Sequence, residues 1–548
     1  MPTYTTLGYR MIDPDYSFRS KYWRFLSDYF IKFYGRKKID DPYWVQKILI
    51  NCFGLLSYNF RDLLKKERRA SFYIFVHNFH ENSVILWKES IENNPELDVT
   101  QDFSKVRRIL KLILEEATLL DLKGTENFGT EIMANYRIYT KLLEELLYIG
   151  IWFFIFSEYA AKSKLFPNSI SLAIEGNDLV INENQPYNSL YRYIESDIPN
   201  HDEEVVVDNN IERIKQVFSD SLGIDYNILG SILSEPGADP RSRFGLINLD
   251  MTKDNICQTY GFNRTYVDDF YAGLTLSKNN TLFLDQRVLT NQDNHRIVYR
   301  PILRLRIDDS YYEMIGYYKW IESLTLLSTN SIPWGIGPEE WTKYEPILKL
   351  FTKIQNYHDK ILENPVKEKL TENNYFYDSN IKTIITDDRN NFHLDREGIG
   401  EIDIIYINEV QEKIIICECK HNRSRFDFNN WRRDYSNFKD SYEPRLDKKV
   451  KWASENTTLI HQHFHNKFRG FEPNITAYSV IGIFIINAPT IYMYDGNYKA
   501  YTLHDFNNLL HDEYISPTFR FIYPETGLTY DIQHPFFQNI DELINTHH

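Results

Sequence analysis

The segment GEIDIIYINEVQEKIIICECKH, residues 400–421, contains three ionisable residues within two strongly apolar stretches: Asp403, Glu418 and Lys420. Charged groups are costly to bury unless they are paired, hydrogen-bonded or bound to a metal. The apolar stretches are typical of β-strands, and a turn near Asn408 would fold them into a hairpin. We therefore expect the three charges to form either a functional site or a solvated sheet edge.

Because successive side chains of a strand alternate between its two faces, the strand period of two determines which residues share a face. Glu418 and Lys420 share one face, and the hairpin brings Asp403 beside Glu418. Cys417 and Cys419 point to the other face. Their one-residue spacing is shorter than the two- to four-residue spacer usual in zinc sites, so we interpret them as core residues.

Two neighbouring carboxylates repel each other, and a divalent cation such as Mg²⁺, or Mn²⁺ in its place, relieves that repulsion. Such a metal polarises a phosphate oxygen and lowers the pKa of a bound water. A nearby lysine can orient or deprotonate the water, or stabilise the charge that develops on phosphorus. This chemistry is phosphodiester hydrolysis, and the alternative interpretation is a salt-bridged sheet edge.

The elements around these strands predict a compact α/β domain with a mixed sheet over residues 345–548. The pattern indicates a helix over residues 345–373, a strand NIKTIIT, the two strands above, a helix over residues 447–464, a strand over 476–487 and a last strand and helix over 498–513. Gly398 and Gly400 suit a tight turn into the strand that carries Asp403.

Asp403, followed after fourteen residues by Glu418-Cys419-Lys420, resembles the PD-(D/E)xK nuclease superfamily, in particular its Holliday-junction-resolvase and Mrr-type restriction branches. The resemblance covers about residues 345–515. It implies that Asp403 and Glu418 bind Mg²⁺ and that Lys420 assists the attacking water, which makes these three the catalytic residues. It also implies a further metal ligand on the preceding helix, at Glu363. Pro365 should start or kink a helix two residues later, so Glu368 is an alternative ligand.

Local charge points to a polyanionic substrate. The whole chain has a net charge of −15, but residues 421–470 hold eleven Lys and Arg against six Asp and Glu, a local balance of +5. Trp431, Tyr435 and Phe438 lie among these cations and could stack on bases. The expected phosphate contacts are Arg423, Arg425, Arg432, Arg433, Lys448, Lys449 and Lys451.

The first 344 residues carry no comparable motif. Residues 1–165 show helical periodicity, and residues 166–344 form a mixed α+β region that opens with a hairpin around Gly176. An acidic stretch, ESDIPNHDEE, predicts an exposed loop. Residues 252–273 outline a helix-turn-helix, with Thr252 as the helix cap, but Asp268 on the second helix disfavours DNA reading and favours a structural pair. We thus predict a helical domain, a mixed regulatory region and a C-terminal restriction-endonuclease-like domain.

Four cysteines in 548 residues argue against a disulfide framework and suggest a reducing compartment. The longest apolar run, LLYIGIWFFIF, has 11 residues, too few to span a bilayer. We expect a cytoplasmic protein without a membrane partner, for which a homo-oligomer is plausible.

The favoured hypothesis is a Mg²⁺-dependent DNA endonuclease with a large N-terminal regulatory or assembly region. By analogy alone, this arrangement is similar to restriction and anti-phage defence effectors. Two alternatives stay open: a catalytically inactive nuclease-like module that binds nucleic acid or supports assembly, and an RNA-cleaving nuclease.

Overall fold

The computed structural model describes residues 3–92, 102–201, 210–231, 244–290, 294–386, 391–422, 428–522 and 527–547. The chain forms two compact units. Unit 1 comprises Met1–Ala160, Leu172–Ile181 and Asp208–Gln355, and unit 2 comprises Ala161–Ser171, Asn182–Val207 and Asn356–His548. This partition differs from the three successive domains expected from the sequence, because the chain passes more than once between the units.

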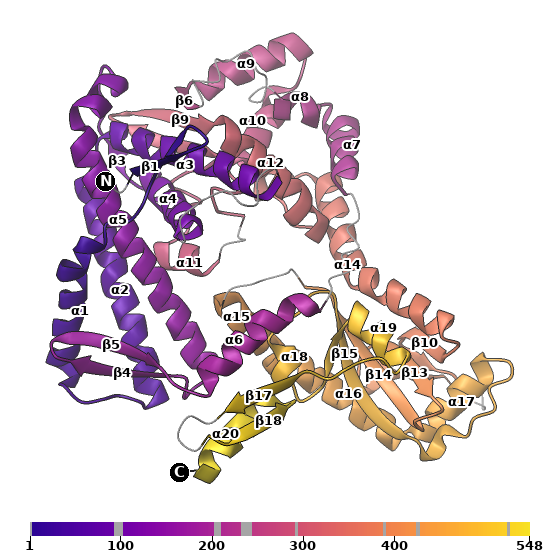
Figure 1. The fold of residues 1–548 in the computed structure, drawn as a ribbon. Coiled ribbons are helices and arrows are strands. Elements are labelled where there is room, and N and C mark those ends of the chain that lie inside the picture. Colours follow the sequence, from indigo (N-terminus) through magenta and orange to yellow (C-terminus); the bar gives the residue numbers. More distant parts are fainter. Residues whose placement is uncertain are drawn as a thin grey trace. The chain divides into compact units, whose positions relative to one another are not determined.

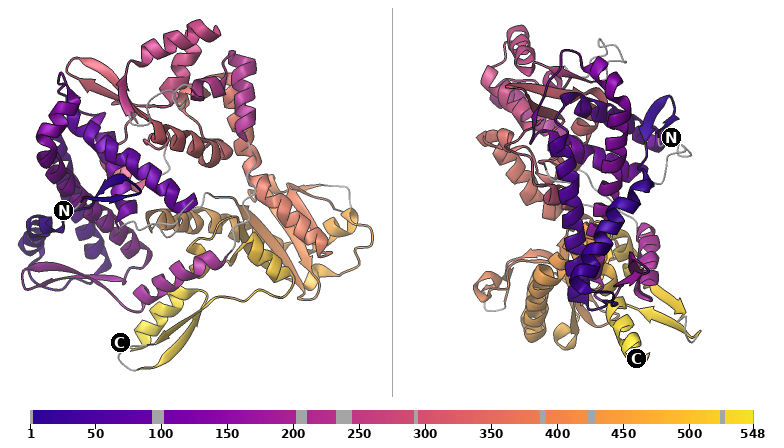
Figure 2. Two further views of the ribbon diagram at one scale, coloured as in Figure 1. Left: turned by 45° about the horizontal axis from the view of Figure 1, so that its top comes forward. Right: turned by 90° about the vertical axis from the view of Figure 1, so that its left-hand side faces the viewer.

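The N-terminal part of unit 1 is helical, as the periodicity predicts. The elements are β1 (Thr3–Thr6), β2 (Tyr9–Ile12), η1 (Tyr16–Phe18), α1 (Arg19–Tyr34), α2 (Pro42–Lys66), α3 (Ala70–Glu92), α4 (Phe103–Ala117) and α5 (Phe128–Leu165). In Figures 1 and 2, α2 and α5 run side by side, and Phe60 of α2 packs edge-on against Phe153 of α5. The run LLYIGIWFFIF lies within α5 with most of its side chains buried. No helix in the described ranges has the length and apolarity to cross a membrane.

The remainder of unit 1 surrounds a sheet in the order β3-β8-β9-β6, with β7 paired to β8. The strands are β3 (Asp121–Leu122), β6 (Phe244–Ile247), β7 (Thr275–Leu276), β8 (Ile302–Ile307) and β9 (Ser310–Gly316). The helices are α7 (Asn210–Leu222), α8 (Tyr226–Ser231), α9 (Leu249–Tyr260), α10 (Arg264–Gly273), α11 (Leu284–Leu289), α12 (Tyr317–Asn330), η3 (Ile332–Trp334) and α13 (Glu339–Thr342). The hairpin predicted near Gly176 is present as β4 (Ile170–Glu175) and β5 (Asp178–Glu183).

Helices α9 and α10 form the helical pair that the sequence outlines. Asn248, and not Thr252, caps α9, because its side chain accepts the N–H of Met251. Gly261 ends α9 at φ +70°, a left-handed conformation that favours glycine. On α10, Asp268 accepts a hydrogen bond from Arg264 Nε of the same helix and forms an ion pair with Lys253 of α9. The acidic side chain is therefore used inside the pair, which agrees with a structural role.

Unit 2 is built on a mixed five-stranded sheet in the order β10-β13-β14-β15-β16 (Figure 1). The strands are β10 (Phe376–Ile381), β13 (Ile402–Asn408), β14 (Lys413–Lys420), β15 (Ser479–Ile486) and β16 (Ala500–Thr502). The first three strands are antiparallel neighbours, whereas β15 and β16 run parallel to β14. This confirms the predicted α/β region with a mixed sheet.

Helices cover both faces of this sheet. One face, with Ile404 and Cys417, packs on Val366 of α14 (Glu345–Glu372) and on Phe506 of α19 (Leu503–Leu510). The other face, with Ile416, packs on the helices that follow β14. Those helices are α15 (Phe428–Asn437), η5 (Phe438–Tyr442), α16 (Glu443–Glu455) and α17 (Thr457–Lys467).

The other elements of unit 2 are shorter. They are α6 (Tyr187–Asp197), η2 (Ile198–Asn200), β11 (Thr383–Ile384), β12 (Phe392–His393), η4 (Leu394–Glu397), η6 (Ile475–Ala477), α18 (Tyr492–Asp495), β17 (Thr518–Ile522), β18 (Thr529–Gln533) and α20 (Phe536–His547).

Three details of unit 2 correct the sequence-based expectations. Helix α14 is continuous through Pro365 and does not restart after it. The helix expected over residues 447–464 is two helices, α16 and α17, and the strand expected at NIKTIIT begins earlier as β10. The described part of ESDIPNHDEE, residues 195–201, is not a loop, because it completes α6 and forms η2, and within it Ile198 and His201 are buried.

Candidate active site

The register of the sheet brings the predicted charges together. Ile404 pairs with Cys417 in the β13–β14 ladder, so the next position places Asp403 opposite Glu418. On the other side of β13, β10 pairs Ser379 with Ile404, which places Asn380 opposite Asp403. The hairpin and the shared face were predicted from the alternation of residues 400–421. The neighbourhood of Asn380 could not be predicted, because β10 joins the sheet from outside the hairpin.

Asp403 is held by the backbone of the neighbouring strand. Its Oδ2 accepts the N–H of Cys419 at 2.8 Å. Burial and the negative charge of Glu418 raise the pKa of the Asp403 carboxyl to about 7, against the opposing effect of Lys420 and Lys449. In the metal-free site this carboxyl thus takes up a proton near neutral pH, and a bound cation would displace that proton.

Glu418 is fully engaged by two lysines. Lys420 Nζ donates to Glu418 Oε1 at 2.8 Å, and Lys449 Nζ donates to Glu418 Oε2. Burial acts to raise the pKa of the Glu418 carboxyl, but the two ammonium groups hold it below its usual value. The site therefore contains one ionised carboxylate and one carboxyl that titrates near neutrality.

Lys420 remains an ammonium in this environment. Burial acts to lower its pKa, yet Glu418 and Asp403 raise the pKa above its usual value. The Nζ atom also lies 5.1 Å from the centroid of the Tyr442 ring, a cation–π contact. Of the roles considered for this lysine, the ammonium suits stabilisation of charge on phosphorus or orientation of a water, and it disfavours proton abstraction.

Lys449 lies in the carboxylate cluster, although we expected it among the phosphate contacts. Its side chain is buried on the inner side of α16. The sequence contains a signal for this position, because Lys449 is three residues from both Leu446 and Trp452, which are buried on the same helix. Helical periodicity therefore assigns Lys449 to the sheet-facing side, and only the fold shows that Glu418 is its partner.

Glu363 lies on α14 and is buried next to the same sheet edge. Asn380 Nδ2 donates to Glu363 Oε2 at 2.9 Å, and Asn380 occupies the position opposite Asp403. Burial raises the pKa of Glu363, although Asn380 acts in the opposite direction. Glu368 is exposed on α14 and lines a different surface recess. Of the two glutamates, Glu363 is therefore the one that lies near this sheet edge.

The carboxyl groups that the site offers to Mg²⁺ are those of Asp403 and Glu418. Across the described ranges, no group of three or more His, Cys, Asp or Glu side chains is arranged to hold a metal ion. Mg²⁺ is commonly bound by one or two carboxylates together with waters and phosphate oxygens. Asp403 and Glu418 fit that pattern, provided that a lysine releases an oxygen of Glu418.

No protein-family model, curated protein or solved structure matches this chain.

The predicted phosphate contacts divide into several environments. Arg433, Lys448 and Lys451 are exposed, and Arg432 is half-buried. Burial lowers the pKa of the Arg432 guanidinium. Arg423 and Arg425 lie outside the described residues.

The three aromatic residues among these cations are used within unit 2. Trp431 and Phe438 are buried in the core, and the Tyr435 hydroxyl donates to Asp495 Oδ2 at 2.8 Å. The rings of Trp431 and Phe438 are thus not available for stacking on bases, contrary to expectation. Hydrophobic spacing alone did not distinguish a core ring from an exposed one.

Proposed function

We propose that this protein is a Mg²⁺-dependent nuclease that hydrolyses phosphodiester bonds in DNA, and that unit 2 is its restriction-endonuclease-like catalytic domain. One observation carries the proposal. Asp403, Glu418 and Lys420 meet at the end of two antiparallel strands, where burial and mutual repulsion raise the pKa of Asp403 to about 7. A buried pair of carboxylates with an adjacent ammonium is a favourable environment for a cation that carries a phosphate.

Each residue of the site would have its own role in the hydrolysis. Asp403 and Glu418 would hold Mg²⁺, with Glu363 as an additional ligand that contacts the metal directly or through a bound water. The metal would polarise the scissile phosphate and lower the pKa of the attacking water. Lys420, which is held as an ammonium, would stabilise the negative charge that develops on the phosphoryl oxygens. The exposed cations Arg433, Lys448 and Lys451 would contact the nucleic-acid backbone.

One observation favours a second function, a nuclease-like module that binds nucleic acid without cleaving it. Lys449 already neutralises the oxygen of Glu418 that Lys420 leaves open. If Lys449 never leaves Glu418, no metal can bind there. The two functions therefore differ in a measurable property, the affinity of the site for Mg²⁺ or Mn²⁺.

The experiment compares the full chain with Lys420→Ala and Asp403→Ala on supercoiled plasmid, linear DNA and RNA, each with Mg²⁺, Mn²⁺ or EDTA. Lys413→Ala, at the other end of β14, is the matched control. We expect metal-dependent DNA cleavage that falls by at least about 100-fold in both site variants and is unchanged in the control. Full cleavage by either site variant would refute the assignment, and cleavage of RNA alone would change the substrate.

A metal titration distinguishes the two functions when no cleavage is seen. Binding of Mn²⁺ that is lost in Asp403→Ala supports an enzyme whose activation conditions were not met. Absence of Mn²⁺ binding to the wild-type chain supports the non-catalytic module.

A further inference from the structure

The outward sides of α1 and α2 in unit 1 carry aromatic side chains that the core does not use. Each helix buries its other side, with Leu26 and Phe30 on α1 and Ile48 and Leu49 on α2. Globular proteins rarely expose large apolar groups next to one another unless the surface binds a partner. We call this surface the aromatic patch, and its exposed or half-buried rings are those of Phe25, Tyr29, Phe33, Tyr43, Trp44 and Tyr58.

Contacts between the two helices make the patch continuous. Helix α1 lies alongside α2 in Figure 1, and Asn51 Nδ2 of α2 donates to the Tyr29 hydroxyl of α1 at 2.9 Å. The rings of Tyr34 on α1 and Trp44 on α2 meet edge-on, with centroids 6.3 Å apart. Tyr29 in turn lies against Phe33, at 5.0 Å between centroids. The rings of both helices therefore belong to one surface.

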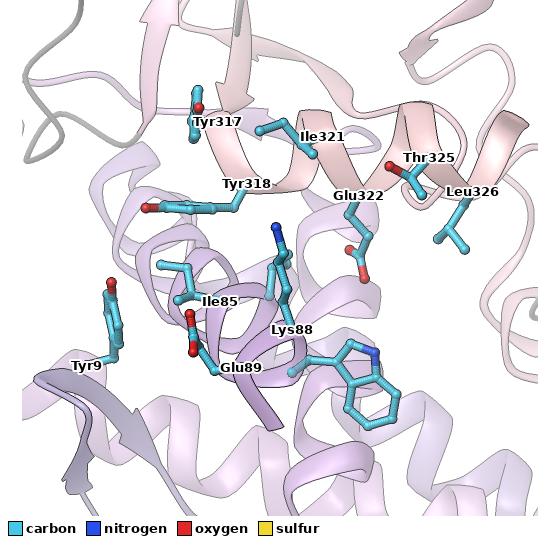
Figure 3. A pocket seen from close by; sticks show the side chains of 12 residues that line it. Tyr9, Ile85, Lys88, Glu89, Tyr317, Tyr318, Ile321, Glu322, Thr325 and Leu326 are labelled. Atoms are coloured by element: carbon cyan, nitrogen blue, oxygen red, sulfur yellow. The ribbon is translucent and has the colours of Figure 1, made fainter. Parts of the chain in front are cut away.

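The patch is long and open. Tyr43 and Tyr58 are 64% and 70% exposed. At a rise of 1.5 Å per residue they lie about 22 Å apart along α2. No ring of the patch lines the pocket of about 520 Å³ between α3 and α12 that Figure 3 shows. A row of exposed rings of this length suits a linear ligand that carries several flat groups.

Cations lie among the rings. Residues 21–58 contain seven Lys and Arg against three Asp and no Glu, a local balance of +4 in a chain with a net charge of −15. Lys32 Nζ lies 5.4 Å from the centroid of the Phe33 ring, and Lys47 Nζ lies 4.9 Å from that of Trp44. Within the described ranges, neither lysine forms an ion pair, and Arg24 forms none either. These charges are therefore available to an anion.

Most carboxylates beside the patch are already engaged. The engaged ones are Glu145 with Lys21, Asp40 with Lys38, and Asp41 as the N-cap of α2. Asp28 of α1 is exposed, and it has no ion pair in the part of the chain that the structure describes. The cations Arg24, Lys32 and Lys47 thus outnumber this one carboxylate, and the patch has a net positive charge.

We propose that the aromatic patch binds single-stranded DNA, with unpaired bases stacked on its rings and phosphates held by Arg24, Lys32 and Lys47. The bases of a duplex stack on one another, whereas those of a single strand offer their faces to aromatic side chains. Rings that alternate with cations on one surface match both parts of such a ligand. Only the choice of DNA over RNA rests on the function proposed for unit 2, since the patch belongs to unit 1 alone.

Two other occupants fit this surface less well. A helix that lies on a membrane has its apolar and cationic residues on opposite faces, whereas here both kinds share the outward side. A second copy of the chain, docked through the same face, would bring the cations of two patches together, and like charges across an interface are unfavourable.

Fluorescence anisotropy tests the proposal with the full chain and a labelled oligothymidylate of about 15 nucleotides. The buffer contains EDTA, so binding is measured whether or not unit 2 cleaves DNA. Oligouridylate and a DNA duplex of the same length, together with phosphatidylserine vesicles, are the comparison ligands. We expect the oligothymidylate to bind most tightly. Equal or tighter binding of any comparison ligand would overturn the assignment to single-stranded DNA.

A triple variant, Arg433→Ala with Lys448→Ala and Lys451→Ala, separates the patch from the phosphate contacts proposed for unit 2. It should still bind the oligothymidylate, because the patch is unchanged. Loss of all binding in this variant would overturn the proposal for the patch and would leave the function proposed for unit 2 in place.

Two ring variants test stacking. Trp44→Ala and Tyr58→Ala should each weaken binding of the oligothymidylate by at least about fivefold, because each removes a ring on which a base stacks. Both rings are at the surface, so the melting temperature should show that the fold is kept. Tyr311→Ala, which removes an exposed tyrosine of β9, is the matched control and should bind as the wild type does. Unchanged affinity in both ring variants would overturn the proposal.

Charge variants test the phosphate contacts. Lys32→Met combined with Lys47→Met should reduce the slope of log K against log salt by about 1.4, because each phosphate contact on a single strand contributes about 0.7. Asp28→Asn should tighten binding by about twofold, because it removes a carboxylate that repels phosphate. Lys349→Met, at an exposed lysine of α14, is the control. An unchanged salt slope in the double variant would overturn the role of these lysines and with it the proposal.

Discussion

Replacement of Asp403 by Asn should stabilise the metal-free protein at neutral and alkaline pH. The folded state raises the pKa of this carboxyl from 3.8 to about 7, largely by burial. Since each pKa unit corresponds to about 1.4 kcal/mol, ionised Asp403 costs the fold about 4 kcal/mol at pH 8. An asparagine has no such charge, and its amide oxygen can still accept the N–H of Cys419.

The sign of the pH dependence follows from the unfolded state, in which the Asp403 carboxyl ionises near pH 4. Below that pH the carboxyl is protonated in both states, and the charge costs nothing. As the pH rises from about 4 to about 7, the unfolded wild type loses this proton before the folded one does, so wild-type stability falls relative to the variant. The gap between the variant and the wild type should therefore widen by roughly 2 to 3 kcal/mol between pH 5 and pH 8.

Amide hydrogen exchange in β13 and β14 is the appropriate assay, because it reports the opening free energy of this sheet separately from that of unit 1. It should be measured in EDTA and again with Mg²⁺, with the exposed Asp531→Asn as the matched control. Mg²⁺ should slow exchange in the wild type and leave Asp403→Asn unchanged. A variant that exchanges as fast as the wild type at both pH values would refute the reasoning, since Asp403 would then be compensated without a metal.

Three further predictions concern individual contacts. Lys449→Met should tighten Mn²⁺ binding by at least about tenfold, because it frees Glu418 Oε2 from a competing cation; unchanged affinity in a calorimetric titration would contradict this. Burial acts to lower the pKa of His201, but hydrogen bonds to two aspartates raise that pKa to about 9. The protonated imidazole therefore stabilises unit 2 by up to about 3 kcal/mol. This stabilisation is fully present below pH 6.5 and is lost as the pH rises through 9. In denaturation experiments, the free energy of unfolding of the wild type should therefore exceed that of His201→Gln at pH 7 and should equal it at pH 10. Gly316→Ala should destabilise unit 1 by roughly 2 to 4 kcal/mol, because the added methyl group displaces the buried Glu81. A melting temperature equal to that of the wild type would contradict this.

The local arrangement of the candidate site could be predicted from sequence because it depends on neighbouring residues. The alternation of apolar residues in 402–420 determines which side chains share a face, and the length of the turn determines that Asp403 meets Glu418. Helical periodicity likewise identified the N-terminal helices and α14. Pro365 lies inside α14, so the prediction that it starts a helix is wrong, because a helix packed on a sheet tolerates the local loss of one hydrogen bond.

Only the tertiary structure decided which distant residues complete the site. Lys449 is 31 residues from Glu418 in the chain, and Asn380 links Glu363 to the same edge through strand pairing that no local pattern encodes. Glu81 and Lys319 of unit 1 are the extreme case, since both side chains are buried although charged residues on helices usually face solvent. Secondary structure and the sharing of a face depend on residues that are close in sequence, so they can be predicted from periodicity. The partner of a buried charge depends instead on how separate elements pack.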